Sequence, residues 1–187
     1  PMCMGVFVLA KEVIFLYAGE KYMAMVSVLM IACIIRIIIS VESTMTNLVM
    51  YPNNQEKKIV QFTLVCGVLN LLLNSFLIVL NIFDPFTCML TTGIAEISLS
   101  ILLYHHISKK LKLNYKLFTK QNMLYILLGF AFIPISLFVR LLNVGFFTTI
   151  VIIMLLCMSL YVGVLYYKKD ENLKFILNKF FRKIGKN

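Results

Sequence analysis

Residues 59–83 read IVQFTLVCGVLNLLLNSFLIVLNIF, an apolar run that contains no charged side chain. A helix needs about 20 predominantly apolar residues to cross the hydrocarbon core of a bilayer. In lipid, only helices and closed barrels satisfy their backbone hydrogen bonds, and this run is too long for a barrel strand. The stretch therefore predicts a transmembrane α-helix.

Similar apolar runs recur along the chain between short polar breaks. The predicted spans cover residues 2–18, 23–50, 59–83, 86–108, 122–142 and 145–167. The composition agrees, because 61% of the residues are hydrophobic, 14% are charged and the mean hydropathy is +0.92, well above the values of soluble domains. We expect an all-α fold: a polytopic transmembrane helical bundle of about six spans in residues 1–167, followed by a basic tail in residues 168–187.

The positive charges predict the orientation of the spans. The chain carries a formal net charge of +10, and its cations lie mostly in alternate breaks and in the tail: Lys57, Lys58, Lys109, Lys110, Lys112, Lys116, Lys120, Lys168, Lys169, Lys174, Lys179, Arg182, Lys183 and Lys186. Since cytoplasmic loops are rich in Lys and Arg, these breaks are expected to be cytoplasmic and to face anionic lipids rather than nucleic acid. An even number of spans then places both ends in the cytoplasm.

The two ends of the chain carry signals of their own. The first residue is Pro1 and no signal peptide follows it, so we expect further sequence upstream. In the tail, apolar residues at helical spacing predict an amphipathic helix lying on the cytoplasmic leaflet, and a docking helix for a partner protein is the alternative. The apolar residues of that helix are Leu173, Ile176, Leu177, Phe180, Phe181 and Ile184.

Polar residues at mid-membrane depth are the candidate functional residues. Arg36 lies at the middle of the second span, Asn70 and Asn74 at the middle of the third and Glu96 at the middle of the fourth. A charge at the bilayer centre costs about 2.5 to 3.5 kcal/mol on insertion scales, so such groups normally face a cavity or a partner. At about 100° per residue each of these spans has a polar face, and three helices can direct these faces at a common interior. The polar faces are Arg36, Ser40, Ser43 and Asn47; Thr63, Gly67, Asn70, Asn74 and Asn81; and Thr92, Glu96 and Ser100.

Two interpretations of these residues stay open. Asn70 and Asn74 either bind a ligand or hold helices together through hydrogen bonds. Arg36 either forms a buried ion pair with Glu96 or meets an anionic substrate. His105 and His106, at the end of the fourth span, are expected to be interfacial residues.

The chain shows no pattern of an enzyme or of a metal site. Its cysteines are scattered singly through apolar runs and are expected to be small buried hydrophobes: Cys3, Cys33, Cys66, Cys88 and Cys157. We find no nucleotide-binding loop, Ser-His-Asp set or carboxylate pair in the sequence. We therefore predict a protein that is not an enzyme and has neither a metal nor a cofactor.

Three segments resemble the bacterial polysaccharide and O-antigen repeat-unit flippases of the multidrug/oligosaccharidyl-lipid/polysaccharide exporter superfamily. GVFVLAKEVIFLYAGEKY (5–22) is similar to a late span of that family. VCGVLNLLLNSFLIVLNIF (65–83) is similar to its Asn-containing helix, and TTGIAEISLS (91–100) to its Ala-Thr-rich segment ending in glutamate. The likeness covers residues 1 to about 110. One departure is Asp84-Pro85-Phe86-Thr87-Cys88, which replaces a Gly-Ala-rich turn and leaves the local helix packing open.

The resemblance implies the C-terminal lobe of a two-lobe transporter in the bacterial plasma membrane. Its substrate would be an undecaprenyl-diphosphate-linked oligosaccharide, flipped by alternating access for capsule or O-antigen synthesis. Arg36 would contact the diphosphate, Asn70 and Asn74 the sugars, and Glu96 would belong to the same site. Implied partners are the N-terminal lobe, anionic lipids and other polysaccharide-assembly proteins.

Three rival functions remain. A multidrug or cation antiporter of the same superfamily would depend on an acidic intramembrane residue such as Glu96. A membrane-embedded glycan enzyme is less compatible with the short predicted outer loops. A non-transporting assembly subunit would leave the charges at mid-membrane depth unexplained.

Overall fold

The computed structural model describes residues 1–112, 119–142, 144–170, 172 and 175. All the regular elements in these residues are helical, so the all-α prediction is confirmed. The chain divides into two compact units: unit 1 is Pro1–Leu9 with Lys120–Asn187, and unit 2 is Ala10–Thr119. The predicted amphipathic helix of the tail lies largely outside the described residues.

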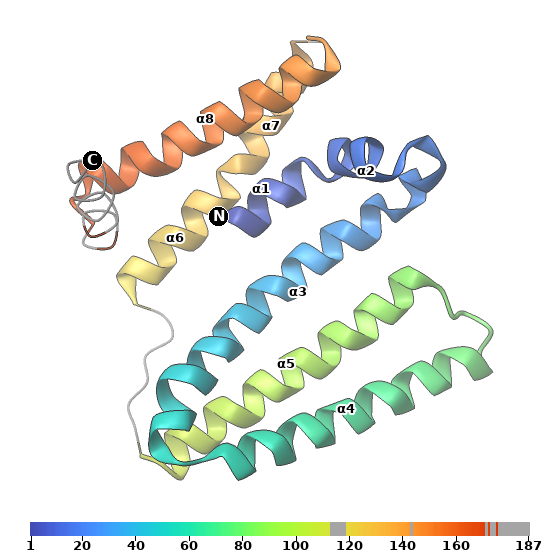
Figure 1. The fold of residues 1–187 in the computed structure, drawn as a ribbon, viewed down its shortest axis with the longest axis vertical. Coiled ribbons are helices and arrows are strands. Elements are labelled where there is room, and N and C mark those ends of the chain that lie inside the picture. Colours follow the sequence, from blue (N-terminus) through green and yellow to red (C-terminus); the bar gives the residue numbers. More distant parts are fainter. Residues whose placement is uncertain (113–118, 143, 171, 173–174, 176–187) are drawn as a thin grey trace, which may run out of the picture. The chain divides into compact units, whose positions relative to one another are not determined.

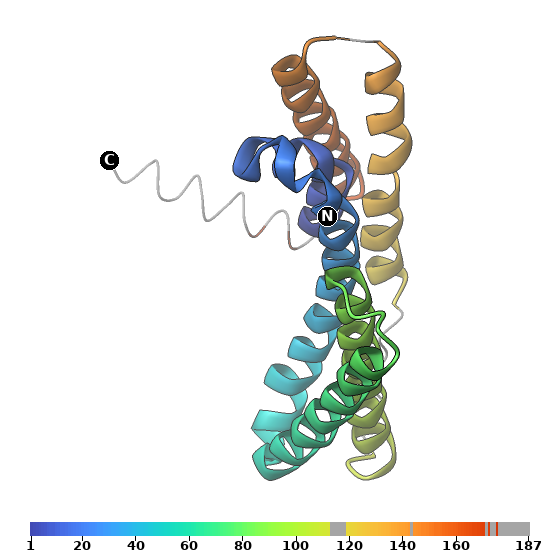
Figure 2. The same ribbon diagram turned by 90° about the vertical axis from the view of Figure 1, so that its right-hand side faces the viewer.

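Unit 2 consists of a short helix followed by three long ones. The elements are α2 (Ala10–Ala18), the 3-10 segment η1 (Glu20–Met25), α3 (Val26–Met45), the π-helical segment η2 (Thr46–Met50), the 3-10 turn η3 (Tyr51–Asn53), α4 (Glu56–Val79) and α5 (Pro85–Lys109). Both ribbon views place α5 beside α3 and α4, and α5 packs against each of them (Figures 1 and 2). Helix α5 is therefore the central helix of a three-helix bundle.

Small and apolar residues hold this bundle together. Gly93 of α5 lies so close to Ile35 of α3 that a Cβ atom on Gly93 would be 3.4 Å from the Ile35 side chain. In lipid, such close packing and not water exclusion drives helix association. Below this contact a buried cluster joins all three helices: Met45, Val49, Met50, Cys66, Leu99, Leu103 and Ile107.

The turns of unit 2 form where polar breaks were predicted. Asn54 and Asn81 adopt left-handed conformations, with φ of 54° and 56°, and each ends a helical segment. Asn tolerates this conformation better than other residues with a side chain. The N–H of Ile82 then donates to the Leu77 carbonyl at 3.1 Å and closes the end of α4. Asn81 thus ends the helix and is not part of the polar face predicted for it.

The unusual segment at 84–88 turns out to be a helix start. The N–H of Thr87 donates to Asp84 Oδ1 at 2.8 Å, and the N–H of Asp84 donates to Thr87 Oγ1 at 3.1 Å. Pro85 occupies the first turn, where its missing N–H removes no helical hydrogen bond. These residues form a capping box that begins α5.

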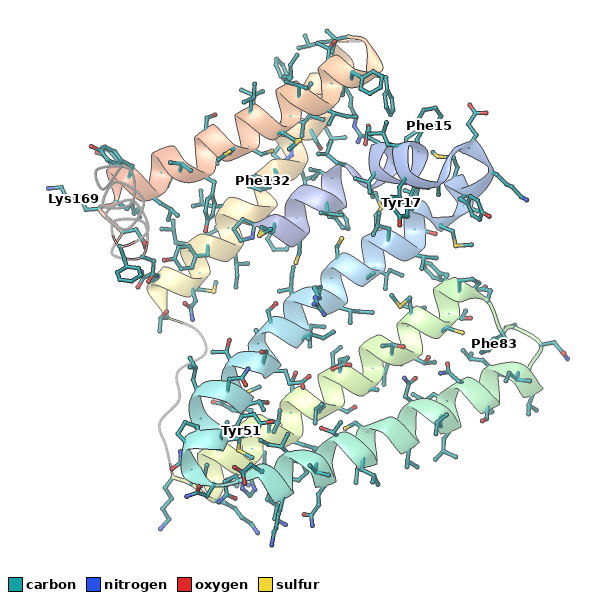
Figure 3. All side chains as sticks on the ribbon, viewed as in Figure 1. Phe15, Tyr17, Tyr51, Phe83, Phe132 and Lys169 are labelled. Carbon is teal, nitrogen blue, oxygen red and sulfur yellow. The ribbon has the colours of Figure 1, made fainter. Side chains whose placement is uncertain are left out.

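Unit 1 contains α1 (Met2–Val8), α6 (Lys120–Phe130), α7 (Phe132–Leu141) and α8 (Phe146–Tyr167). Helices α6 and α7 form one span with a break at Ala131, next to Phe132 in Figure 3. Pro134 explains the break, because a proline ring clashes with the carbonyl four residues earlier, here that of Phe130, and cannot donate to it. The buried core of the unit is Met4, Val8, Leu9, Phe132, Val139, Ile153 and Cys157.

The prediction that residues 2–18 form one membrane-spanning helix is wrong. Residues 2–18 form α1 and α2, which are separated at Leu9, and each is shorter than the length needed to cross a bilayer. Five helical segments in the described residues are long and apolar enough to do so: Glu20–Asn53, Glu56–Val79, Pro85–Lys109, Gln121–Leu141 and Phe146–Tyr167. The chain is therefore a multi-pass membrane protein with five candidate spans. The prediction that both ends are cytoplasmic depended on an even number of spans. It stays a prediction.

Candidate functional site

A polar network joins α4 and α5 inside unit 2. Asn74 Nδ2 donates to Asn70 Oδ1 at 3.1 Å, one turn away on α4. Thr91 Oγ1 on α5 donates to Asn74 Oδ1 at 2.7 Å and also contacts the Cys88 carbonyl at 2.8 Å. Thr91 is buried and both asparagines are half-buried. The structure thus brings the two predicted asparagines together, and Asn74 already serves as a link between helices.

A second polar group lies between α3 and α5, where two carboxyl groups meet. Glu42 of α3 and Glu96 of α5 are within hydrogen-bonding reach of each other. Cys66 of α4 is buried and close enough to both carboxyls to interact with them electrostatically. Glu96 was predicted as a site residue, but its partner Glu42 was not.

The carboxyl pair lies deep in the bundle. Cys66 is ten residues after the start of α4, and Glu96 is thirteen residues before the end of α5. At a rise of about 1.5 Å per residue, both lie roughly 15–20 Å from the helix ends that carry the lysines. This is about half the thickness of a bilayer hydrocarbon core.

Two polar atoms in this region are buried and have no hydrogen-bond partner among the described residues: Glu42 Oε2 and Ser100 Oγ. Ser100 follows Glu96 by one turn of α5. Two ionised carboxylates side by side in a medium of low dielectric constant repel each other strongly. A proton on either carboxyl would relieve the repulsion and supply the missing donor, so the arrangement is suited to holding a proton.

Arg36 is not part of this interior. Arg36, Ser40, Ser43 and Asn47 are all exposed, and they follow one face of α3 and of the segment η2 that continues it. On a helical wheel this face is rotated by roughly 100° or more from Ile35 and Glu42, which point toward α5. Side chains of this face form hydrogen bonds within the same helical segment, and Asn47 Nδ2 donates to Ser43 Oγ at 2.9 Å. The prediction that all three polar faces meet in one interior is therefore wrong for this face.

The possible ion pair between Arg36 and Glu96 is absent from the structure. Within the described part of the chain, the guanidinium of Arg36 makes no hydrogen bond or ion pair, whereas Glu96 lies beside Glu42. Arg36 remains near the middle of its span, on the exposed side of the bundle.

The two histidines differ in their surroundings. His105 is exposed, whereas His106 is buried at 6% exposure. His106 Nε2 lies 3.1 Å from Oε1 of Gln55, just before α4, and its ring packs edge-on against Phe62 at a centroid distance of 5.5 Å. His106 is therefore a packing residue that connects the end of α5 to the start of α4.

Unit 1 holds two polar contacts that sequence reasoning missed. Arg140 lies in the last turn of α7 and donates from Nη2 to the carbonyl oxygen of Val8 at 2.7 Å. Asp170 is buried and accepts hydrogen bonds from Gln121 Nε2 at 2.8 Å and from the Tyr125 hydroxyl at 2.7 Å. Both contacts join residues more than forty positions apart, and no local sequence pattern marks them.

Comparison of the chain with protein-family models, with curated proteins and with solved structures finds no match.

Proposed function

We propose that this chain is one lobe of a membrane transporter that flips undecaprenyl-diphosphate-linked oligosaccharides across the bacterial plasma membrane for surface polysaccharide synthesis. The proposal starts from the sequence resemblance described above. The five candidate spans are compatible with it, since translocation of a lipid-linked sugar requires a polytopic helical protein.

The observation that carries the proposal is the exposed polar face of α3. A guanidinium at mid-membrane depth is costly against acyl chains, so it normally meets water or an anionic partner. Arg36 has no partner within the described residues, and Ser40, Ser43 and Asn47 extend the same face. A planar guanidinium binds phosphate oxygens in a bidentate manner, and hydroxyl and amide groups suit the hydroxyls of a sugar. This face would line the path of the headgroup.

Substitution of Arg36 in the full-length protein tests the proposal. Arg36→Ala should abolish surface polysaccharide while the protein remains in the membrane at normal abundance. Arg36→Lys should restore only part of the output, because an ammonium group supplies charge without the bidentate geometry. Lys21→Ala, which removes a cation at the end of the same span, is the matched control and should leave the amount of surface polysaccharide unchanged. Normal polysaccharide from Arg36→Ala would rule out the assigned role.

The carboxyl pair favours a second candidate, a proton-coupled antiporter for drugs or other cations. Two adjacent carboxyls inside the bundle are suited to taking up and releasing a proton, and the proton gradient would then drive export. Under this proposal Glu42→Gln and Glu96→Gln each abolish drug export from cells, whereas Glu56→Gln at the exposed start of α4 does not. Unchanged export of cationic dyes by both pair variants would exclude it.

A further inference from the structure

We propose that one end of unit 2 binds the headgroups of anionic phospholipids through a lysine cluster. The cluster consists of Lys57 and Lys58 at the start of α4, Lys109 at the end of α5, and Lys110 and Lys112 just beyond it. Four of these lysines are exposed and Lys58 is half-buried.

The structure brings the two halves of the cluster together through the buried His106. The contacts of His106 with Gln55 and Phe62 fix the last turn of α5 against the first turns of α4. Lys58 and Lys110 both lie close enough to His106 to interact with it electrostatically. Cations that are about fifty residues apart in the sequence thus surround one junction between two helices. A headgroup phosphate at this junction would contact both helices.

The opposite ends of the same helices have a different charge. Asp84 caps the start of α5, and no lysine lies between Lys58 of α4 and Lys109 of α5. In η1, before α3, Lys21 lies next to Glu20. At the lysine cluster the acid within the first turn of α4 is Glu56. Figure 3 labels Tyr51 near the lysine end of unit 2 and Phe83 in the turn at the other end. The positive charge is therefore concentrated at one end of the bundle.

The partner follows from where the cluster lies in the membrane. Helices α4 and α5 are both long enough to cross the hydrocarbon core, so their ends lie at the level of the lipid headgroups. Lysines at this level attract anionic lipids, and each raises the affinity by roughly fivefold near a membrane surface. Four of the five lysines are exposed, so the cluster is in contact with water. A flexible, hydrated ammonium group can follow a mobile phosphate in such a place.

The test measures which lipids the purified full-length chain retains. The protein is reconstituted in vesicles of equal parts phosphatidylglycerol and phosphatidylcholine, extracted in mild detergent, and its bound lipids are counted by native mass spectrometry. The wild type should retain phosphatidylglycerol severalfold over phosphatidylcholine. A variant with all five lysines replaced by Gln should lose this preference. A control variant, Lys11→Gln with Lys21→Gln, removes exposed cations elsewhere in unit 2 and should keep it.

Variants with one substitution keep the test decisive if the variant with all five substitutions fails to fold. Lys57→Gln and Lys109→Gln change exposed side chains, and each should lower the phosphatidylglycerol preference by up to roughly fivefold. An unchanged preference in these variants, or an equal loss in the control, would overturn the proposal. Displacement of the lipid by millimolar inorganic phosphate would also overturn it, because the cluster would then be a site for a free anion.

Discussion

Thr91 joins two transmembrane helices through a single hydroxyl group. Thr91→Val keeps the shape of the side chain but removes the donor to Asn74 Oδ1, 2.7 Å away. We expect a loss of about 1 kcal/mol of unfolding free energy, within the range of interhelical hydrogen bonds in membranes. Denaturation with SDS in mixed micelles measures it.

Thr63→Val is the matched control for this prediction. Thr63 is exposed on α4, and the structure gives its hydroxyl no bond to another described side chain. The same substitution there should change the unfolding free energy little. If both variants unfold alike, the Thr91–Asn74 bond contributes nothing measurable.

Contacts between polar side chains could be predicted from the sequence where both residues lie on one helix. Asn70 and Asn74 are four residues apart, and helical spacing alone places them side by side. Glu42 was missed as a site residue because its partner Glu96 lies on another helix. Only the packing of α3 against α5 brings these two carboxyls together.

The capping box of α5 is an element whose contribution to stability can be measured. Asp84→Ala removes the acceptor for the N–H of Thr87 and should cost about 1 kcal/mol of unfolding free energy. Asp84→Asn keeps a side-chain oxygen that can accept this bond and should retain most of the stability. Thermal denaturation in detergent compares the variants. Equal destabilisation by Asn and Ala would show that the carboxylate charge matters and not the cap.

The boundaries of elements were predictable where local chemistry sets them. Asn54 and Asn81 end helical segments by adopting the left-handed conformation, and both lie in or next to predicted breaks. The break at Leu9 has no such signal, because neither Leu9 nor its neighbours Val8 and Ala10 is a Gly, Asn or Pro. In a continuous helix the Val8 carbonyl would accept from the N–H of residue 12, but here it accepts from Arg140. A contact across 132 residues thus accompanies the break.

At the scale of the whole molecule, the spans make a prediction about sidedness. Helices α4 and α5 have 24 and 25 residues and are about 36 Å long, more than the hydrocarbon core. In a chain without its native cysteines, Asn53→Cys and Lys112→Cys should react with an impermeant maleimide from one side of oriented vesicles. Phe83→Cys should react only from the other side.

A cysteine at Asn70, half-buried near the middle of α4, is the control and should react from neither side. Labelling of Asn53, Phe83 and Lys112 variants from the same side would mean that α4 and α5 do not cross the membrane.

The sequence by itself determined that this protein is a bundle of membrane-spanning helices. A run of about 20 apolar residues has one stable form in lipid, whatever surrounds it. The tertiary structure alone decided which polar groups meet, because that depends on how each helix is rotated against its neighbours. It placed Glu96 beside Glu42, left Arg36 on an exposed face and divided residues 2–18 into two helices.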